Sequence, residues 1–304
     1  MRIAHLLLYS MNISLRQDLV HTSTHKYALQ HVRLSNGSNV AYIDEGSGEH
    51  TIVFVHGLAT YGRSWRYQID ELKKHYRCIA IDLPGNGYSD RGKHDYSMHF
   101  FAGCVYDFMQ QLKLQNVILA GHSMGGQVVM RLLQEVPDAA SKLILCAPAG
   151  FETFSPMESS MYKSTITMLD MFSTEENSLR QSIRTSFFQY PKHIDEMVEE
   201  LIQIMRSHSV RNYRHMIDAC VNGMLDEPVY DKLHLIKQPT LVLYGERDAL
   251  IPNRWIHPVT TKHIAEEGVK QLQNVQLEMI PQCGHFLQLE KPHLVNAAIR
   301  KFVS

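Results

Sequence analysis

The stretch that most constrains the fold of this chain runs from Asn116 to Glu135. Residues 117–120 are a short apolar run with the composition of a strand buried on both faces, and apolar residues then recur at helical spacing over 128–133. Between the two lies the sequence GHSMG at 121–125, a G-x-S-x-G turn. A turn of this kind between a strand and a helix places its serine on a sharp, strained bend at the carboxyl edge of a sheet. Ser123 is therefore the candidate nucleophile.

The motif GHSMGG at 121–126, in this strand–turn–helix context, resembles the nucleophile turn of the α/β-hydrolase superfamily. The resemblance is greatest to its capped serine esterases and monoacylglycerol-lipase-like enzymes, and it covers most of the chain from about residue 30. It implies a mostly parallel central sheet flanked by helices, with an inserted helical cap. Dehalogenases and epoxide hydrolases of the same fold carry an aspartate at the nucleophile position, so Ser123 argues against both.

The hydrophobic pattern predicts the elements of such a sheet. Strands are expected on either side of the Asn36-Gly37 turn, which is a strong hairpin signal. Further strands are expected at 51–55, 77–81, 142–146, 240–244 and 275–280, and helices at 61–76, at 97–114 and in the last residues up to Val303. Alternating strands and helices favour a parallel sheet covered on both faces.

Only helical periodicity appears between about residues 150 and 235. The sequence STEE at 173–176 predicts a capping box, and Pro191 predicts the start of a further helix. We expect a helical cap at 150–235, a hydrolase core formed by 27–149 and 236–304, and an N-terminal extension at 1–26. Most of the methionines of the cap are expected to pack it against the sheet domain, and a minority that faces Ser123 is expected to form an apolar wall for an acyl or alkyl group. These methionines are Met157, Met161, Met168, Met171, Met197, Met205, Met216 and Met224.

Two residues are candidates to activate Ser123. His285 follows the last predicted strand and is the expected base, and Asp248 follows the strand at 240–244 and is the expected carboxylate partner. The chain order Ser123, Asp248, His285 is the one expected for this fold. On residue type alone a helix cap is the commoner role for an aspartate such as Asp248, and His285 is one of 18 histidines, but both residues match the family at the positions of its acid and base. The loop after residue 146 offers no alternative carboxylate.

The resemblance also implies an oxyanion hole built from backbone N–H groups. Its donors are expected to be the N–H of Met124, which follows the nucleophile, and the N–H of Leu58 in the loop after the strand at 51–55. His56 is expected to orient this loop rather than to act as a second base. The segment 82–90 is interpreted as a structural loop at the edge of the sheet.

The remaining candidate sites are weak. Cys283 lies close to His285 but not where it could replace Ser123. His208 and His215 could share a helix face, yet no third ligand accompanies them, so no metal site is expected. The sequence contains neither a P-loop nor a dinucleotide fingerprint, and no cofactor is expected.

The composition is that of an ordinary globular protein, with 44% hydrophobic and 20% charged residues and a formal net charge of -1. This charge gives no reason to expect nucleic acid as a partner. Five irregularly spaced cysteines argue against a disulfide framework. The apolar run at 3–9 is too short to span a bilayer and is a poor signal peptide, so no stable membrane span and a cytoplasmic location are expected.

These observations lead to a serine hydrolase that cleaves carboxylic esters of small molecules, either short-to-medium acyl esters or monoacylglycerol-like substrates. Two alternatives remain open, because a fold does not define a function. One is a carbon–carbon bond hydrolase that acts on ring-cleavage products. The other is a non-enzymatic ligand receptor that uses the same pocket.

Overall fold

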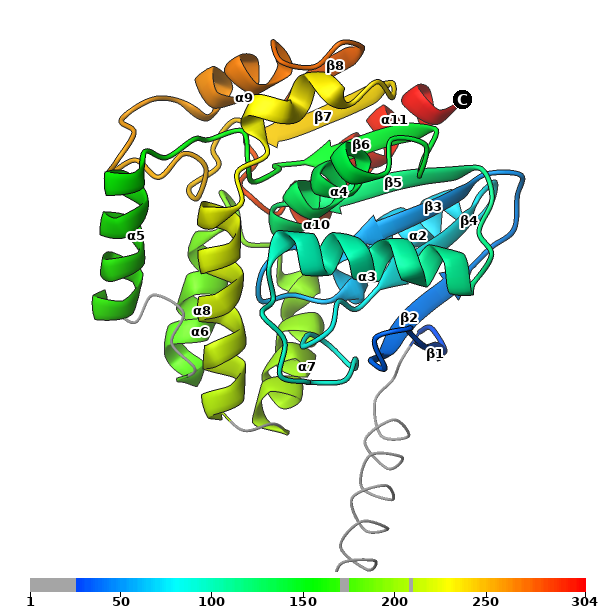
Figure 1. Cartoon of the computed structure of the whole chain (residues 1–304), viewed down its shortest axis with the longest axis horizontal. Coiled ribbons are helices and arrows are strands. Elements are labelled where there is room, and N and C mark those ends of the chain that lie inside the picture. The colour runs from blue at the N-terminus through cyan, green and yellow to red at the C-terminus, as the bar shows by residue number, and fades with distance from the viewer. Residues whose placement is uncertain (1–25, 170–174, 208–209) are drawn as a thin grey trace, which may run out of the picture.

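A computed structural model of the protein describes residues 26–169, 175–207 and 210–304, so the extension expected at 1–26 lies almost wholly outside the described residues. An eight-stranded sheet in the order β1-β2-β4-β3-β5-β6-β7-β8 crosses the molecule (Figure 1). The strands are β1 (Leu29–Arg33), β2 (Asn39–Glu45), β3 (Thr51–Val55), β4 (Arg77–Ile81), β5 (Val117–His122), β6 (Lys142–Cys146), β7 (Thr240–Gly245) and β8 (Val275–Ile280). β1 and β2 pair antiparallel and β2 is antiparallel to β4, whereas every pair from β4 to β8 is parallel. The predicted mostly parallel sheet is therefore confirmed.

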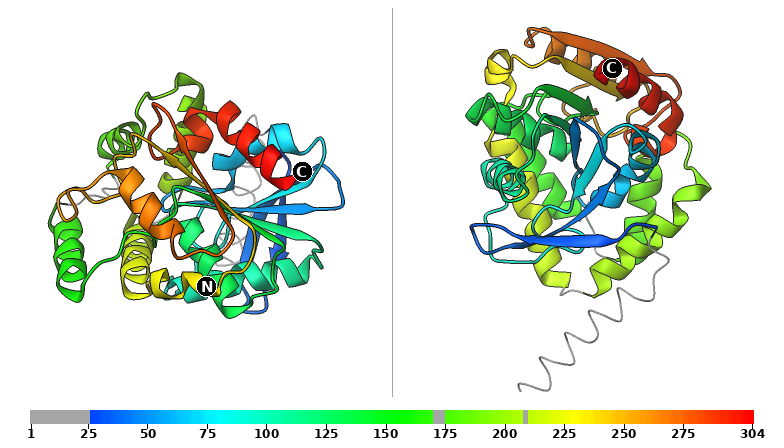
Figure 2. Two further views of the ribbon diagram at one scale, coloured as in Figure 1. Left: turned by 90° about the horizontal axis from the view of Figure 1, so that it is seen from above. Right: turned by 90° about the vertical axis from the view of Figure 1, so that its right-hand side faces the viewer.

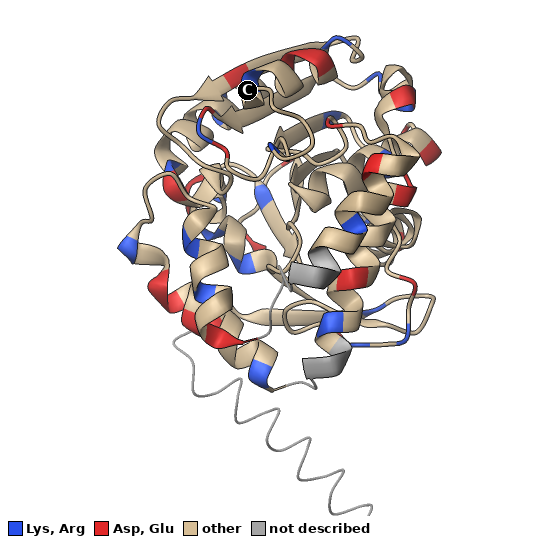
Figure 3. Ribbon diagram, turned by 90° about the vertical axis from the view of Figure 1, so that its left-hand side faces the viewer, with Lys and Arg blue, Asp and Glu red and all other residues tan. Residues whose placement is uncertain are grey.

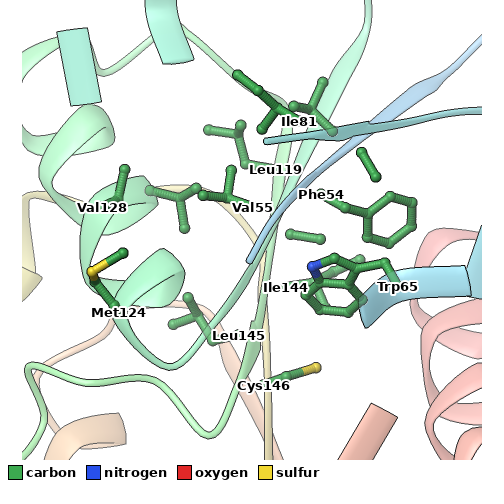
Figure 4. Packing of buried hydrophobic residues seen from close by; sticks show 14 of the residues in the cluster. Phe54, Val55, Trp65, Ile81, Leu119, Met124, Val128, Ile144, Leu145 and Cys146 are labelled. Atoms are coloured by element: carbon green, nitrogen blue, oxygen red, sulfur yellow. The ribbon is translucent and has the colours of Figure 1, made fainter. Parts of the chain in front are cut away.

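Helices cover both faces of this sheet (Figure 2). Those that pack on the sheet are α2 (Arg66–Leu72), α3 (Met98–Gln111), α4 (Met124–Glu135), α9 (Thr261–Val269) and α11 (Pro292–Val303), and the short α10 (Leu287–Glu290) packs against α2 and α11. α2 packs against α11, and α3 packs against α4. All residues of β3 are buried, and the ring of Phe54 lies 5.0 Å from that of Trp65 (Figure 4). Burial on both faces explains the continuous apolar runs in the sequence.

The helix expected at 61–76 is shorter and begins differently. A single 3₁₀ turn, η1 (Gly62–Trp65), precedes α2, which ends at Leu72. The backbone N–H of Gly62 donates to the carboxylate of Asp82 (2.6 Å), and a Cβ on Gly62 would lie 3.0 Å from the carbonyl oxygen of Ala80. Because the backbone at Gly62 lies this close to β4, the chain first forms the narrower 3₁₀ turn, and the α-helix begins after it.

The chain between β6 and β7 contains helices joined by turns and loops, and no strand among its described residues. This insertion contains α5 (Pro156–Leu169), α6 (Glu176–Thr185), η2 (Lys192–Ile194), α7 (Asp195–Arg206), α8 (Val210–Asp226) and η3 (Tyr230–Leu235). It lies on the side of the molecule where the parallel strands end (Figure 1). The amide of Gln127 on α4 holds it there by donating to the carbonyls of Met224 and Glu227 (2.9 and 3.1 Å).

Two predictions for the insertion need correction. The residue that caps α6 is Glu175, whose carboxylate accepts the N–H groups of Asn177 and Ser178. Ser173, the first residue of the predicted capping box, lies outside the described residues. Met157 and Met161 do not pack against the sheet domain, because α5 packs on α8 and leaves these residues 68% and 58% exposed.

Other methionines of the insertion are buried as expected, among them Met197, Met205 and Met216. None of the described helices combines the length and the apolar character needed to cross a bilayer. Lys and Arg positions are interspersed with Asp and Glu positions along the ribbon in Figure 3, in keeping with the small net charge.

Gly125 allows α4 to begin directly against β3. A Cβ at this position would lie 2.4 Å from the carbonyl oxygen of Val55 and 2.5 Å from that of His56, and backbone atoms cannot move aside easily. We predict that Gly125→Ala lowers the free energy of unfolding by about 3 kcal/mol, measured by urea denaturation. Gly103→Ala on α3 is the control: its Cβ would have no neighbour within 4 Å, so it should be neutral or stabilise by up to about 1 kcal/mol. Equal stabilities of the two variants would contradict the close approach.

Candidate active site

Ser123 lies on a strained turn between β5 and α4. Its backbone has φ 52° and ψ −120°, a region that L-residues rarely occupy. Hydrogen bonds hold the backbone there: the Ser123 N–H donates to the carbonyl of Cys146 (3.0 Å), and its carbonyl accepts the N–H groups of Gly126 (2.9 Å) and Ala149 (3.0 Å). The turn is thus fixed by the end of β6 and the residues after it as well as by its own helix.

His285 and Asp248 lie at the same edge of the sheet, in the loops that follow β8 and β7. Nδ1 of His285 is 2.8 Å from Oδ2 of Asp248, and both side chains are buried. The second carboxylate oxygen accepts the N–H groups of Leu250 (2.8 Å) and Ile251 (3.0 Å). The hydrogen bond to a carboxylate assigns the proton to Nδ1 and leaves Nε2 as the basic nitrogen.

Asp248 does not cap a helix, the alternative role that its residue type allowed. The next helix, α9, begins at Thr261 and is capped by the hydroxyl of Thr260. One oxygen of the carboxylate instead accepts hydrogen bonds from the backbone of the turn at 248–251, and the other accepts the hydrogen bond from His285. The structure therefore brings together two residues that lie 37 positions apart in the chain.

The loop that carries His285 is clamped by the insertion. The His285 N–H donates to the carbonyl of Ser186 (2.9 Å). The buried carboxylate of Glu290 accepts three backbone N–H groups, from Gly284 (2.8 Å) in the same loop and from Phe188 (3.2 Å) and Gln189 (2.7 Å) in the insertion. Sequence reasoning missed Glu290, and its one signal was an acidic residue within the otherwise uncharged run 286–290.

His122, next to the nucleophile, was also missed. Its Nε2 lies 3.1 Å from the carbonyl oxygen of His285, and its ring is 4.9 Å from that of His285 and 5.0 Å from that of Phe286. Burial, and then the proximity of His285, hold the pKa of His122 well below its usual value. His122 is therefore neutral, and its Nε2–H donates to the backbone of the residue that is expected to act as base.

The predicted oxyanion donors are available. Within the described part of the chain, neither the N–H of Leu58 nor that of Met124 has a hydrogen-bond partner. Met124 is the first residue of α4, where N–H groups have no partner within the helix. The free N–H groups and the positive end of the helix dipole are suited to an anion.

His56 orients the loop that contains Leu58, as the sequence suggested. Its Nε2 accepts the N–H of Leu83 (3.0 Å), so Nδ1 carries the proton and donates to the carbonyl of Gly57 (2.8 Å). Burial lowers the pKa of His56 to about 4. With both ring nitrogens bonded to backbone, His56 is not placed to act as a base.

The segment 82–90 is a structural loop. The buried Asp82 carboxylate accepts the N–H groups of Gly62 (2.6 Å) and Tyr88 (2.8 Å). Burial raises the pKa of Asp82 to about 7, although these two hydrogen bonds act in the opposite direction.

The weaker candidates find no support in the structure. All five cysteines are free and buried, and burial raises the pKa of Cys283, so its thiol is not a nucleophile. His208 lies outside the described residues. Among the residues described, no group of three or more His, Cys, Asp or Glu side chains could hold a metal ion.

The Glu290 clamp predicts a measurable stability effect. Glu290→Gln replaces one acceptor oxygen with an NH₂ group that faces a backbone N–H, and hydrogen bonds to charged groups contribute about 1.5–3 kcal/mol each. We expect the free energy of unfolding to fall by about 2 kcal/mol or more in urea denaturation. Glu278→Gln, on the exposed side of β8, should stay within about 0.5 kcal/mol of the parent protein. If the two variants were equally stable, Glu290 would not hold the loop.

Comparison with known proteins agrees with this architecture. The profile of the alpha/beta hydrolase fold family matches residues 50–292, so the chain belongs to the α/β-hydrolase family. The chain is 30% identical over 266 residues to the AB hydrolase superfamily protein YisY of Bacillus subtilis, a match that covers 85% of this chain and 93% of YisY. It is 25% identical over 287 residues to Epoxide hydrolase 2 of Caenorhabditis elegans, covering 86% of this chain and 76% of that protein.

Two solved esterase structures are similar. A thermophilic esterase from Thermogutta terrifontis superposes with a TM-score of 0.72 at 25% identity, over 90% of this chain and 98% of the esterase. The esterase EaEST from Exiguobacterium antarcticum gives a TM-score of 0.76 at 24% identity, also over 90% and 98% of the two chains. The second likeness is one of fold alone.

Proposed function

We propose that this protein is a serine hydrolase of carboxylic esters, in the capped, monoacylglycerol-lipase-like branch of its family. The observation that carries the proposal is the buried hydrogen bond between His285 and Asp248, at the sheet edge where Ser123 lies on its strained turn. The similarity to the esterase from Thermogutta terrifontis supports it. A serine at the nucleophile position suits an acyl-enzyme, whereas the family's epoxide hydrolases are expected to use an aspartate.

The proposed reaction has two halves. Nε2 of His285 takes the proton of the Ser123 hydroxyl as the oxygen attacks the ester carbonyl, and the N–H groups of Leu58 and Met124 stabilise the oxyanion. The tetrahedral intermediate collapses to an acyl-enzyme, and His285 gives its proton to the departing alcohol. Water, deprotonated by His285, then attacks the acyl group and releases the carboxylic acid and free Ser123. Asp248 stabilises the imidazolium that forms in each half.

In this proposal residues 150–235 are a cap on a core formed by 27–149 and 236–304. The ring of Phe187, in the insertion, stacks on that of Phe286 at 5.1 Å, directly beside His285. Because the insertion contributes backbone and aromatic contacts to the base loop, it is placed to define the wall of an acyl site. The expected substrates are short-to-medium acyl esters or monoacylglycerol-like molecules.

The nucleophile is tested by active-site labelling. A fluorophosphonate probe should label Ser123, and Ser123→Ala should abolish labelling and lower kcat on a p-nitrophenyl ester by at least about a thousandfold. Ser164→Ala, on the exposed part of α5, should change neither. Labelling that persists in Ser123→Ala would refute the assignment. Ligand binding without turnover in the parent protein would favour the receptor alternative.

Acyl length tests the apolar site. Each buried methylene contributes up to about 0.8 kcal/mol, so half of that over four carbons raises kcat/KM by roughly tenfold. We predict a maximum at about C4 to C10 in a p-nitrophenyl series from acetate to palmitate, with palmitate poorer because the insertion bounds the site. A steady fall from acetate upward would exclude an apolar acyl site and favour a compact or polar substrate, such as that of a carbon–carbon bond hydrolase.

A further inference from the structure

Arg91 is a partly buried cation whose guanidinium forms no ion pair with any carboxylate of the described residues. It lies in the loop at 82–97 between β4 and α3, where its Nε donates to the carbonyl of Gly85 (2.9 Å). Both terminal nitrogens, Nη1 and Nη2, are buried, and neither has a hydrogen-bond partner among the described residues. The buried guanidinium of Arg63, by contrast, is paired with the carboxylates of Glu196 and Glu200. The two terminal nitrogens of Arg91 therefore carry four N–H groups that no described residue accepts.

A second unsatisfied donor lies beside it. Tyr213, on α8 of the insertion, is 5% exposed, and its hydroxyl is buried with no partner in the described part of the chain. The Cζ atom of Arg91 is 5.9 Å from the centre of the Tyr213 ring. The loop at 82–97 and α8 of the insertion thus each contribute unpaired hydrogen-bond donors where the two segments meet. Buried polar groups are nearly always hydrogen-bonded, so these unpaired donors are suited to a partner that the chain itself does not supply.

Within the described part of the chain, no carboxylate contacts the guanidinium of Arg91. The titratable groups that act on it are the phenols of Tyr213 and Tyr96, and Cys220 lies close enough to act on Tyr213. Tyr96 donates its hydroxyl to the carbonyl of Gly92 (2.7 Å). Burial lowers the pKa of Arg91 to about 10, which still leaves it charged at neutral pH. The neighbouring carboxylate of Asp90 is engaged elsewhere, by the N–H of Asn39.

The chemistry of the missing partner follows from these donors. A buried charge is costly unless it is paired, and a guanidinium cannot lose its proton to escape that cost. The planar fork of two N–H groups fits the two oxygens of a carboxylate, and a phenol can donate a third hydrogen bond. A carboxylate accepts only and carries one negative charge, which matches the single positive charge present.

We propose that Arg91 and Tyr213 form a binding site for a carboxylate at the junction of the core and the insertion. The site lies at the sheet edge that carries Ser123, because the loop at 82–97 follows β4 and is bonded to the Leu58 loop through His56. The carboxylate has two possible sources: a second carboxyl group on the substrate, as in a monoester of a dicarboxylic acid, or a free carboxylate ion. The first source rests on the proposed ester hydrolysis, and the second does not.

Binding is tested first, without turnover. The melting temperature of the full-length protein is measured in butyrate, succinate, phosphate and chloride at constant ionic strength and pH. The carboxylates should raise it in a saturable way and chloride should not. Arg91→Gln should weaken the apparent Kd for succinate at least about tenfold, and Tyr213→Phe by roughly threefold to tenfold. Arg33→Gln, an exposed arginine on β1, makes the same chemical change and should leave the Kd unaltered.

The source is tested by comparing two esters. The p-nitrophenyl monoester of succinate carries a free carboxylate, and p-nitrophenyl butyrate is its neutral counterpart. If the substrate supplies the carboxylate, Arg91→Gln lowers the ratio of kcat/KM for the anionic ester to that for the neutral ester at least about tenfold. If the melting temperature responds to succinate but the ratio does not change, the ligand is a free carboxylate ion.

Two results would overturn the site. One is a melting temperature that no carboxylate changes more than chloride does. The other is an equal response of the parent protein and Arg91→Gln, which would mean that water alone satisfies the guanidinium. If Arg91→Gln does not fold, Arg91→Lys, which keeps the charge but loses the planar fork, and Tyr213→Phe decide the question. A protein that binds carboxylates but hydrolyses no ester would refute the proposed function and leave this site in place.

Discussion

The strained backbone of Ser123 depends on how closely three strands and a helix approach one another. The turn is possible because α4 begins against the carbonyl groups of Val55 and His56, where a side chain at Gly125 would not fit. The end of β6 holds the Ser123 backbone from the other side. Parallel pairing of β3, β5 and β6 then places the loops after these strands at one edge. A serine in such a position is exposed to a ligand without being free to move.

The second organising feature is the shared support of the base loop. Ser186 and the backbone at 188–189 belong to the insertion, yet they bond directly to the His285 loop or to Glu290, which holds it. His122 supports the same loop from the nucleophile side. The insertion is therefore part of the framework that positions His285. A rearrangement of this segment would alter the base as well as the substrate site.

Buried polar groups in this molecule divide into two kinds. The carboxylates of Asp82 and Glu290 are fully engaged by backbone N–H groups, and they order loops. The guanidinium of Arg91 and the hydroxyl of Tyr213 have no such partners among the described residues. Since desolvated donors are costly to leave unpaired, the carboxylates of the first kind stabilise the structure, and the donors of Arg91 and Tyr213 are those for which we propose a ligand.

The sequence alone determined the architecture and the three candidate residues Ser123, Asp248 and His285. Buried parallel strands leave continuous apolar runs, and each candidate lies in the turn or loop that follows one of them; the choice of Asp248 and His285 within these loops came from the resemblance to the α/β-hydrolase family. His285 and Asp248 can form a hydrogen bond because β7 and β8 are neighbouring parallel strands, and the loops that follow such strands lie at the same edge of the sheet.

The tertiary structure alone decided what lies around these residues. The side chains of Glu290 and His122 form hydrogen bonds with the backbone of segments that are distant in the sequence. A local sequence pattern does not predict which backbone carbonyl or N–H group a side chain will bond. The sequence also did not predict the exposure of Met157 and Met161, because helical spacing shows which residues share a helix face but not what packs against that face. The isolation of Arg91 could not be read from the sequence, since it depends on where 31 acidic residues come to lie in three dimensions.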